Sequence, residues 1–457
     1  MNIQRRALLT GASVTAAVLL AGGCAGGAAG GSGANATKGK QGECVHVVDG
    51  NTGRTGDACL PVAPAENRVD LDEPRFTHPT RITNPLHPTS KVTQVIMGGQ
   101  VDGKPFRTEV SLLPDTKRIE YDGRSVETRV IQYVAFSDGR VHEVALDWYA
   151  QADDGSVWYL GEDVFNYADG VVADTDGTWQ AGRDGAPPAM IMPADPEKGD
   201  VYRPENLPEK VFEEVTVKAV DGTVDGPYGR VEGAVTVREL HMDGSTEEKV
   251  FAPGYGEFST GTPGGDLEAV SLAVPTDAKP GPLPVRLTAL ADAVDAAHET
   301  PSAATARTVR AAWDAYRASD AVPDLLERQT ERDLTALERA GSEGAKAVGP
   351  ALRVAQDVTD LRLRYEPLDT VDRDRLALWA EQLGIDARAG DEGATAGDVT
   401  GLELVWERVG TGTPSSAVDD GLRELRAVAD RGDTAEAGRL VRGLMESIDS
   451  LPMTRQE

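Results

Sequence analysis

The sequence has few basic residues, only three cysteines and almost no long apolar runs. Lys and Arg number 46 against 75 Asp and Glu in 457 residues, so the formal net charge is −29 at pH 7. A polyanion without a cluster of bases repels nucleic-acid phosphates and anionic lipid headgroups, so no nucleic-acid partner is expected. The one apolar stretch that approaches membrane length lies at the extreme N-terminus. The length predicts at least two hydrophobic cores.

Motifs of common enzyme chemistry are also missing. The sequence contains no Gly-x-Ser-x-Gly elbow, no P-loop and no dinucleotide-binding glycine pattern. Its six histidines form no close-spaced pair of the kind that zinc enzymes use, so neither a metal nor another cofactor is predicted. Asp174 and Asp176 begin a pattern like a calcium loop, but no Glu closes it. These absences favour a non-enzymatic protein without deciding the question.

The first 24 residues have the order of an export signal. Arg5 and Arg6 precede an apolar stretch at 7–20, and the small residues Ala21-Gly22-Gly23 precede Cys24. A cysteine directly after small residues resembles the lipobox of actinobacterial membrane lipoproteins, in which the thiol carries a lipid and the chain is cut before it. The resemblance implies a signal peptide at 1–23, a lipidated Cys24 and a place on the extracytoplasmic face of the plasma membrane. An uncleaved anchor or a plain signal peptide is the alternative.

Two features adjoin this signal. Arg5-Arg6-Ala7-Leu8-Leu9 resembles the twin-arginine export motif, although two arginines also suit the general export route. Residues 24–42 are rich in Gly, Ala and Ser, show no hydrophobic periodicity and predict a flexible tether. The folded part is therefore expected to be joined to the membrane through a lipid and a flexible segment.

The two remaining cysteines, Cys44 and Cys59, form an even pair in a chain that is expected to be exported. A disulfide is the usual outcome, and a turn signal at 49–53 would let the two ends meet. A two-thiolate metal site or two free thiols are the alternatives, and His46 is the one neighbour that could add a metal ligand. Residues 43–81 are predicted to be a disulfide segment.

The pattern of apolar residues changes from strand-like to helical near residue 280. Residues 82–278 alternate apolar and polar side chains between repeated Asp-Gly dipeptides, among them Asp102-Gly103, Asp138-Gly139 and Asp221-Gly222, which favour type I′ hairpins and an antiparallel sheet. The proline-rich stretch 187–208 is predicted to be an irregular loop. A Pro-rich linker at 279–284 leads to residues 285–457, whose apolar spacing of three and four is typical of an α-helical bundle or of helical hairpins. The predicted fold class is α+β multidomain.

Two sets of side chains in the helical region are expected to be structural. Three tryptophans on apolar stripes are predicted to lie in the core: Trp313, Trp379 and Trp406. Four arginines are predicted to pair with nearby acids on solvated faces: Arg362, Arg364, Arg373 and Arg375. The possible partner of this region is another protein.

The densest group of aromatic and acidic side chains lies at 147–179. The candidate groove residues are Asp147, Trp148, Trp158, Tyr159, Glu162, Asp163 and Trp179. Aromatic faces stack on sugars or cover acyl chains, and carboxylates select polar groups, so these residues could bind a carbohydrate or a lipid. One alternative is an amphipathic hairpin whose aromatics only pack a core. Another is a glycosidase-like hydrolase that uses the carboxylates between Asp147 and Asp163.

Several motifs of this region occur in one order. They run from Leu146-Asp147-Trp148-Tyr149 through Gly177-Thr178-Trp179-Gln180 to Phe251-Ala252-Pro253-Gly254-Tyr255. In this order, residues 91–258 resemble a β-rich domain of unknown function found in secreted bacterial proteins. The resemblance implies no activity. The expectation for the whole chain is a lipid-anchored extracytoplasmic protein with a non-enzymatic ligand-binding or scaffolding role, and the hydrolase is the alternative.

Overall fold

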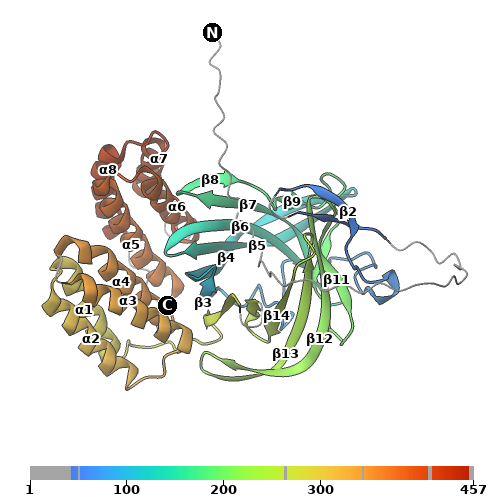
Figure 1. The fold of residues 1–457 in the computed structure, drawn as a ribbon, viewed down its shortest axis with the longest axis horizontal. Coiled ribbons are helices and arrows are strands. Elements are labelled where there is room, and N and C mark those ends of the chain that lie inside the picture. Colours follow the sequence, from blue (N-terminus) through green and yellow to red (C-terminus); the bar gives the residue numbers. More distant parts are fainter. Residues whose placement is uncertain (1–42, 50–51, 262–264, 342–343, 410–413, 452–457) are drawn as a thin grey trace, which may run out of the picture.

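Figure 1 shows a computed structural model of the chain, which describes residues 43–49, 52–261, 265–341, 344–409 and 414–451. The predicted signal peptide, Cys24 and the tether lie outside the described residues. A strongly curved antiparallel sheet comes first in the chain, and helices pack against one side of it. The predicted α+β fold class, with the sheet before the helices, is confirmed.

Most strands of the large sheet pair with their neighbours in sequence. The strands are β3 (Gln94–Val101), β4 (Lys104–Tyr121), β5 (Arg124–Ser137), β6 (Arg140–Gln151), β7 (Val157–Ala168), β8 (Val171–Asp174), β9 (Trp179–Gln180), β10 (Ala189–Met192), β11 (Val201–Leu207), β12 (Val211–Gly226), β13 (Gly229–His241), β14 (Thr246–Ala252), β15 (Gly256–Gly261) and β16 (Leu267–Val274). Their order is β10-β7-β6-β5-β4-β3-β16-β15-β14-β13-β12-β11, with β8 and β9 also paired to β7. The sheet is therefore a series of hairpins closed by the pairing of β3 with β16.

Asp-Gly turns form several of these hairpins. Both residues have positive φ, as a type I′ turn requires, at Asp102-Gly103, Asp122-Gly123, Asp138-Gly139 and Asp169-Gly170. The prediction of a turn at Asp221-Gly222 is wrong, because this dipeptide lies inside β12. Register shifts on both sides of it accommodate the positive φ of Asp221, and the chain turns further on, between Gly226 and Gly229.

The sheet curls until its two edge strands, β10 and β11, lie side by side. Both strands fall within 187–208, so the prediction of an irregular loop there is wrong. Proline is tolerated at a sheet edge because one side of an edge strand makes no ladder hydrogen bonds, and Pro204 lies in β11. The curl gives the sheet an inner face on which distant strands meet, as the hydrogen bond between Glu162 of β7 and Glu205 of β11 illustrates.

The inner face is apolar over part of its length and charged toward one end. Along β13, the buried Val235 and Val237 are followed on the same face by Glu239 and then by His241. On the neighbouring strand β14, Lys249 lies opposite Val237 and forms an ion pair with Glu239. The same strands therefore supply both the apolar core and a layer of charge.

The helices form two apolar clusters. They are α1 (Val285–Glu299), α2 (Ala303–Arg317), α3 (Asp324–Ala340), α4 (Val348–Arg362), α5 (Leu368–Ala389), α6 (Glu392–Val409), α7 (Ser416–Ala429) and α8 (Thr434–Asp449), with the 3-10 turn η2 (Gly344–Ala347) before α4. One cluster, around Trp313, holds α1–α4 together and includes Ile96 and Leu272 of the sheet. The other, around Trp406, joins α5–α8. None of the helices in the described part of the chain has the length and apolarity needed to cross a membrane.

A short hairpin at the start of the described chain packs on the sheet. Its strands are β1 (His46–Val48) and β2 (Thr55–Cys59), followed by the 3-10 turn η1 (Ala65–Asn67). The structure joins Cys44 to Cys59 in a disulfide, with their Cα atoms 5.2 Å apart. Just before the disulfide, the Glu43 carboxylate lies 2.9 Å from the guanidinium of Arg203, which is almost fully buried in β11. The hairpin is therefore fixed to the sheet.

A network of buried ion pairs joins the sheet to the helices. Arg375 of α5 is fully buried, and its guanidinium donates to Gln94 Oε1 at 2.7 Å, to Asp372 Oδ1 at 2.8 Å and to Asp360 Oδ1 at 2.9 Å. The prediction that Arg375 lies on a solvated helix face is wrong. The Arg375 side chain faces Gln94 of β3 and Glu109 of β4, so its charge is neutralised by buried acids instead of by water.

Glu109 of β4 is the sheet's carboxylate in this network. One of its oxygens lies 2.8 Å from Arg107, and the other lies 2.9 Å from Arg408 of α6. Burial alone would raise its pKa, but the guanidinium groups of Arg375, Arg107 and Arg408 hold the pKa of Glu109 far below its usual value. Each charge in the network is therefore compensated by a charge from another element.

We predict that Arg375→Met strongly destabilises the chain. The change leaves the Asp360, Asp372 and Glu109 carboxylates with less than their full complement of cations, and breaking a buried ion pair costs about 3–5 kcal/mol. Urea unfolding followed by circular dichroism measures the loss. The exposed Arg423 forms one surface pair, and Arg423→Met should change the free energy of unfolding little. Equal midpoints for the two variants would contradict the central role of Arg375.

Candidate functional site

The predicted groove residues divide between the two faces of β6 and β7. Asp147 and Glu162 are cross-strand partners on the inner face, where the Tyr159 hydroxyl donates to Asp147 Oδ1 at 2.8 Å. Asp163 points to the opposite face, and its carboxylate lies 3.3 Å from the ammonium of Lys117. The acids therefore do not line one surface.

The three tryptophans of the predicted groove are buried. Trp148, Trp158 and Trp179 are 1%, 4% and 2% exposed, so their rings do not form an open groove, and this prediction is corrected. The Lys117 ammonium lies 3.2 Å from the centroid of the Trp148 ring, and Trp179 packs edge-on against Tyr159. The aromatics belong to the core because β9 and the segments that follow β7 cover them.

Three neighbouring acids of the inner face, Asp147, Glu162 and Glu205, have raised pKa values. Burial raises the pKa of Asp147 to about 7. Burial, together with the charge of Asp147, raises the pKa of Glu162 to about 8. Glu205, which shares a hydrogen bond with Glu162, also has a pKa well above its usual value because it is buried. Close carboxyl groups in a site of low polarity cannot all ionise, so these groups remain partly neutral.

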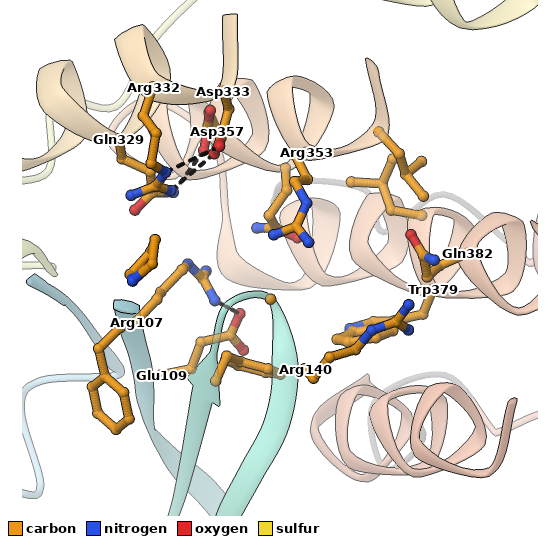
Figure 2. A pocket seen from close by; sticks show the side chains of 17 residues that line it. Arg107, Glu109, Arg140, Gln329, Arg332, Asp333, Arg353, Asp357, Trp379 and Gln382 are labelled. Atoms are coloured by element: carbon orange, nitrogen blue, oxygen red, sulfur yellow. Dashed lines mark hydrogen bonds and ion pairs between the residues drawn. The ribbon is translucent and has the colours of Figure 1, made fainter. Parts of the chain in front are cut away.

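A pocket lies where the sheet meets the helices (Figure 2). It has a volume of about 130 Å³ between β4, the β5–β6 hairpin and helices α3, α4 and α5. A cavity of about 150 Å³ holds one benzene molecule, so the pocket suits a small ligand. Its apolar wall includes Leu352, Leu378 and the stacked pair of Phe136 and Trp379, whose ring centroids lie 5.8 Å apart.

Four guanidinium groups line this pocket, those of Arg107, Arg140, Arg332 and Arg353. Acids behind the wall hold two of them: Arg107 pairs with Asp360, and Arg140 pairs with Asp386. The other two, Arg332 and Arg353, have side chains 44% and 42% exposed. Arg332 pairs with Asp333, and Arg353 donates to the backbone oxygen of Asp138 at 3.0 Å. Part of each of these two guanidinium groups is therefore open to a ligand.

Asp357 adds a polar group that is only half satisfied. Its Oδ1 accepts a hydrogen bond from Gln329 Nε2 at 2.6 Å, whereas its buried Oδ2 has no hydrogen-bond partner among the described residues. Burial, together with the charge of Asp333, raises the pKa of Asp357 well above its usual value. A protonated Asp357 is a hydrogen-bond donor in the pocket wall, and a buried donor is stabilised by an acceptor. Each of the four guanidinium groups has an acid beside it: Asp360 for Arg107, Asp386 for Arg140, Asp333 for Arg332 and Asp138 for Arg353.

A second, wider hollow of about 670 Å³ lies between β6, β7 and helices α6 and α7. Its polar side chains already have partners: Arg426 pairs with Glu403 at 2.5 Å, and Trp406 Nε1 donates to Asp419 at 2.7 Å. The pocket of Figure 2 is the better candidate site, because it presents open cations and an unsatisfied carboxyl together.

Comparisons with protein-family models, with curated proteins and with solved structures find no match for this chain. The resemblances of the N-terminus to lipoproteins and of residues 91–258 to a secreted β-rich domain therefore stay predictions. Function has to be argued from the chemistry of the site.

Sequence reasoning missed most of the pocket. Trp379 was noticed, but as a core residue, and it is only half-buried here. The Asp138-Gly139 turn was also visible, but nothing in the sequence places it beside α4. A φ of +77° favours glycine at position 139, and a Cβ atom there would come within 2.4 Å of Arg353 Nη1 and displace the end of this flexible side chain.

We predict that the chain loses stability as pH rises from about 5 to about 8. The unfolded chain releases the Asp147 and Glu162 protons near pH 4, whereas the folded chain keeps them up to their pKa values of about 7 and 8. The folded state thus binds more protons in this window, and each group contributes up to about 1.4 kcal/mol per pH unit.

The same measurement tests the two residues directly. Asn and Gln have the shape of protonated Asp and Glu but do not titrate. Asp147→Asn and Glu162→Gln should therefore each reduce the decline in the free energy of unfolding, measured by urea titration from pH 5 to 8. Asp163→Asn alters the neighbouring carboxylate on the opposite face and should keep the wild-type slope. A wild-type slope in all three variants would show that these acids are not the protonated groups.

Proposed function

We propose that this chain is an exported lipoprotein, anchored through Cys24 at the extracytoplasmic face of the plasma membrane, that binds a small organic anion between its sheet and its helices. The observation that carries the proposal is the concentration of four guanidinium groups around an aromatic wall in a chain of net charge −29. In such an acidic chain, an anion is stabilised only where cations are gathered locally.

The chemistry of the pocket supports an anion that contains a single ring. A guanidinium group binds a carboxylate or a phosphate through two parallel hydrogen bonds, and Arg332 and Arg353 have donors available. The faces of Phe136 and Trp379 offer an apolar surface to a ring. A volume of about 130 Å³ suits a single aromatic or sugar ring, not a long acyl chain. Of the two ligand classes expected from the sequence, a carbohydrate that carries a carboxylate fits this pocket better than a lipid.

Binding without turnover is supported by the residue types present. The described residues that line the pocket include no Ser, Cys, His or Lys, so their nucleophilic and basic groups are limited to the carboxyls of Glu109, Asp333 and Asp357. Arg107 and Arg140 are held in place by ion pairs, which favours a preformed site.

One observation favours the hydrolase as a second candidate. Asp147 and Glu162 face each other across β6 and β7, and directly opposed residues have Cβ atoms about 5 Å apart. Retaining glycosidases place their two carboxyl groups about 5 Å apart and raise the pKa of the general acid. Both residues are 9% exposed, which disfavours access for a sugar. Hydrolysis of aryl glycosides by the wild type, lost in Asp147→Asn and in Glu162→Gln, would favour the hydrolase.

We predict that the chain binds benzoate more tightly than benzamide. The two probes share shape and size, but only benzoate carries the charge that a guanidinium group prefers, so the difference should be about 10-fold in affinity. Ligand-observed NMR titration of the full chain measures both affinities.

The variants assign the preference to the pocket. The double variant Arg332→Gln with Arg353→Gln should bring benzoate binding down to that of benzamide. The matched control Arg423→Gln removes an exposed arginine on α7, away from the described pocket, and should keep the preference. Equal binding of the two probes by the wild type would defeat the proposed anion site.

We also predict that Cys24→Ser abolishes incorporation of a labelled fatty acid and releases the chain from membranes. The thiol is the proposed site of lipid attachment, so its loss removes the anchor and leaves the disulfide intact. The control replaces Cys44 and Cys59 together by Ser and should keep the label. A wild-type chain that stays unlabelled would disprove the lipoprotein assignment.

A further inference from the structure

Three side chains with metal-binding atoms meet on the charged end of the inner face. Glu213 of β12 and His241 of β13 are cross-strand partners, and Glu239 lies on the same face of β13, two residues before His241. One donor atom from each residue lies within 4.8 Å of the other two. The curl and register of the sheet bring the three side chains together.

The spacing of these atoms exceeds that of hydrogen bonds. His241 Nδ1 lies 3.4 Å from Glu213 Oε1 and 3.9 Å from Glu239 Oε1. An N–H···O hydrogen bond is about 2.7–3.2 Å long. Two ligands that are each about 2.1 Å from a tetrahedral ion are roughly 3.4 Å apart. His241 Nδ1 and Glu213 Oε1 therefore have the separation of two ligands that share one ion, and Glu239 Oε1 lies somewhat farther from the ring nitrogen, at 3.9 Å.

Glu239 supplies an independent indication of a ligand. The residue is 2% exposed, and its Oε1, which points toward His241 Nδ1, accepts no hydrogen bond of ordinary geometry from the described residues, although the Glu213 carboxyl lies beside it. The Lys249 ammonium lies 3.1 Å from the other oxygen, Oε2, and so leaves Oε1 unsatisfied. A buried carboxylate oxygen without a partner costs free energy, and a bound cation removes that cost.

The far side of the histidine ring is also arranged for metal binding. His241 Nε2 lies 3.6 Å from Glu247 Oε1, on the opposite side of the imidazole from Glu213 and Glu239. In metal sites, a carboxylate beside the second ring nitrogen selects the tautomer whose first nitrogen binds the ion. At 3.6 Å this pair is longer than a hydrogen bond, so Glu247 would have to move closer to keep the proton on Nε2 and leave Nδ1 free as a ligand.

We infer that Glu213, Glu239 and His241 bind a divalent transition-metal ion on the inner face of the sheet. One imidazole nitrogen with two carboxylate oxygens suits Zn²⁺, Co²⁺ or Mn²⁺ better than Ca²⁺ or Mg²⁺, which prefer oxygen alone. Three protein ligands leave at least one position for water. The site is separate from the pocket of Figure 2, so the inference does not depend on the proposed anion binding.

Cobalt titration of the full chain tests this inference. Co²⁺ bound by nitrogen and oxygen ligands absorbs visible light, so the wild type should develop a band that saturates at one equivalent and disappears when Zn²⁺ is added. Glu239→Gln and His241→Asn should abolish the band. Glu247→Gln, which alters only the residue behind the ring, should weaken binding about 10- to 100-fold.

A control variant and a second measurement, NMR of the histidine rings, complete the test of the metal site. Glu248→Gln changes the exposed neighbour of Glu247 on the other face of β14 and should bind Co²⁺ like the wild type. If the buried variants fail to fold by circular dichroism, NMR of the histidine rings in the wild type should show His241 shifting with Zn²⁺. A wild type that binds neither ion, an unshifted His241, or folded Glu239→Gln and His241→Asn variants that bind like the wild type would overturn the inference.

Discussion

The burial of Arg375 is the constraint on which the arrangement of sheet and helices depends. A guanidinium group that is fully removed from water must be matched by acids in fixed positions, and these come from α4, α5 and β4. Once the helices are held there, the Arg107 and Glu109 side chains that complete the network also form one wall of the pocket. The stability of the interface and the shape of the candidate binding site thus have the same physical origin.

The parts of the fold that depend on local chemistry could be predicted from the sequence. Type I′ turns at Asp102-Gly103 and Asp138-Gly139 follow from the dipeptide itself, and the change from strands to helices follows from the spacing of apolar residues. The edge strands β10 and β11 could not be predicted, because proline argues against a strand unless the strand is known to lie at an edge. Burial of Arg375 could not be predicted either, since Gln94 and Glu109, which contact it from the sheet, are far away in the sequence.

The candidate sites also combine features that follow from the local sequence with features that depend on contacts between distant elements. Strand alternation separates Asp147 from Trp148, but only the curl of the sheet decides which face becomes the interior. Glu213 and His241 are far apart in sequence and adjacent across a strand pair, so a search for close-spaced ligands along the chain misses them. The pocket is harder still to foresee, because it exists only where a hairpin of the sheet touches three helices.

The ion pair between Glu43 and Arg203 also has a consequence for orientation. It fixes the first described residue to β11, and the hairpin that follows lies at the end of the molecule opposite α8 (Figure 1). With a lipid at Cys24, as proposed, this end of the folded part is the one that the predicted tether would join to the membrane.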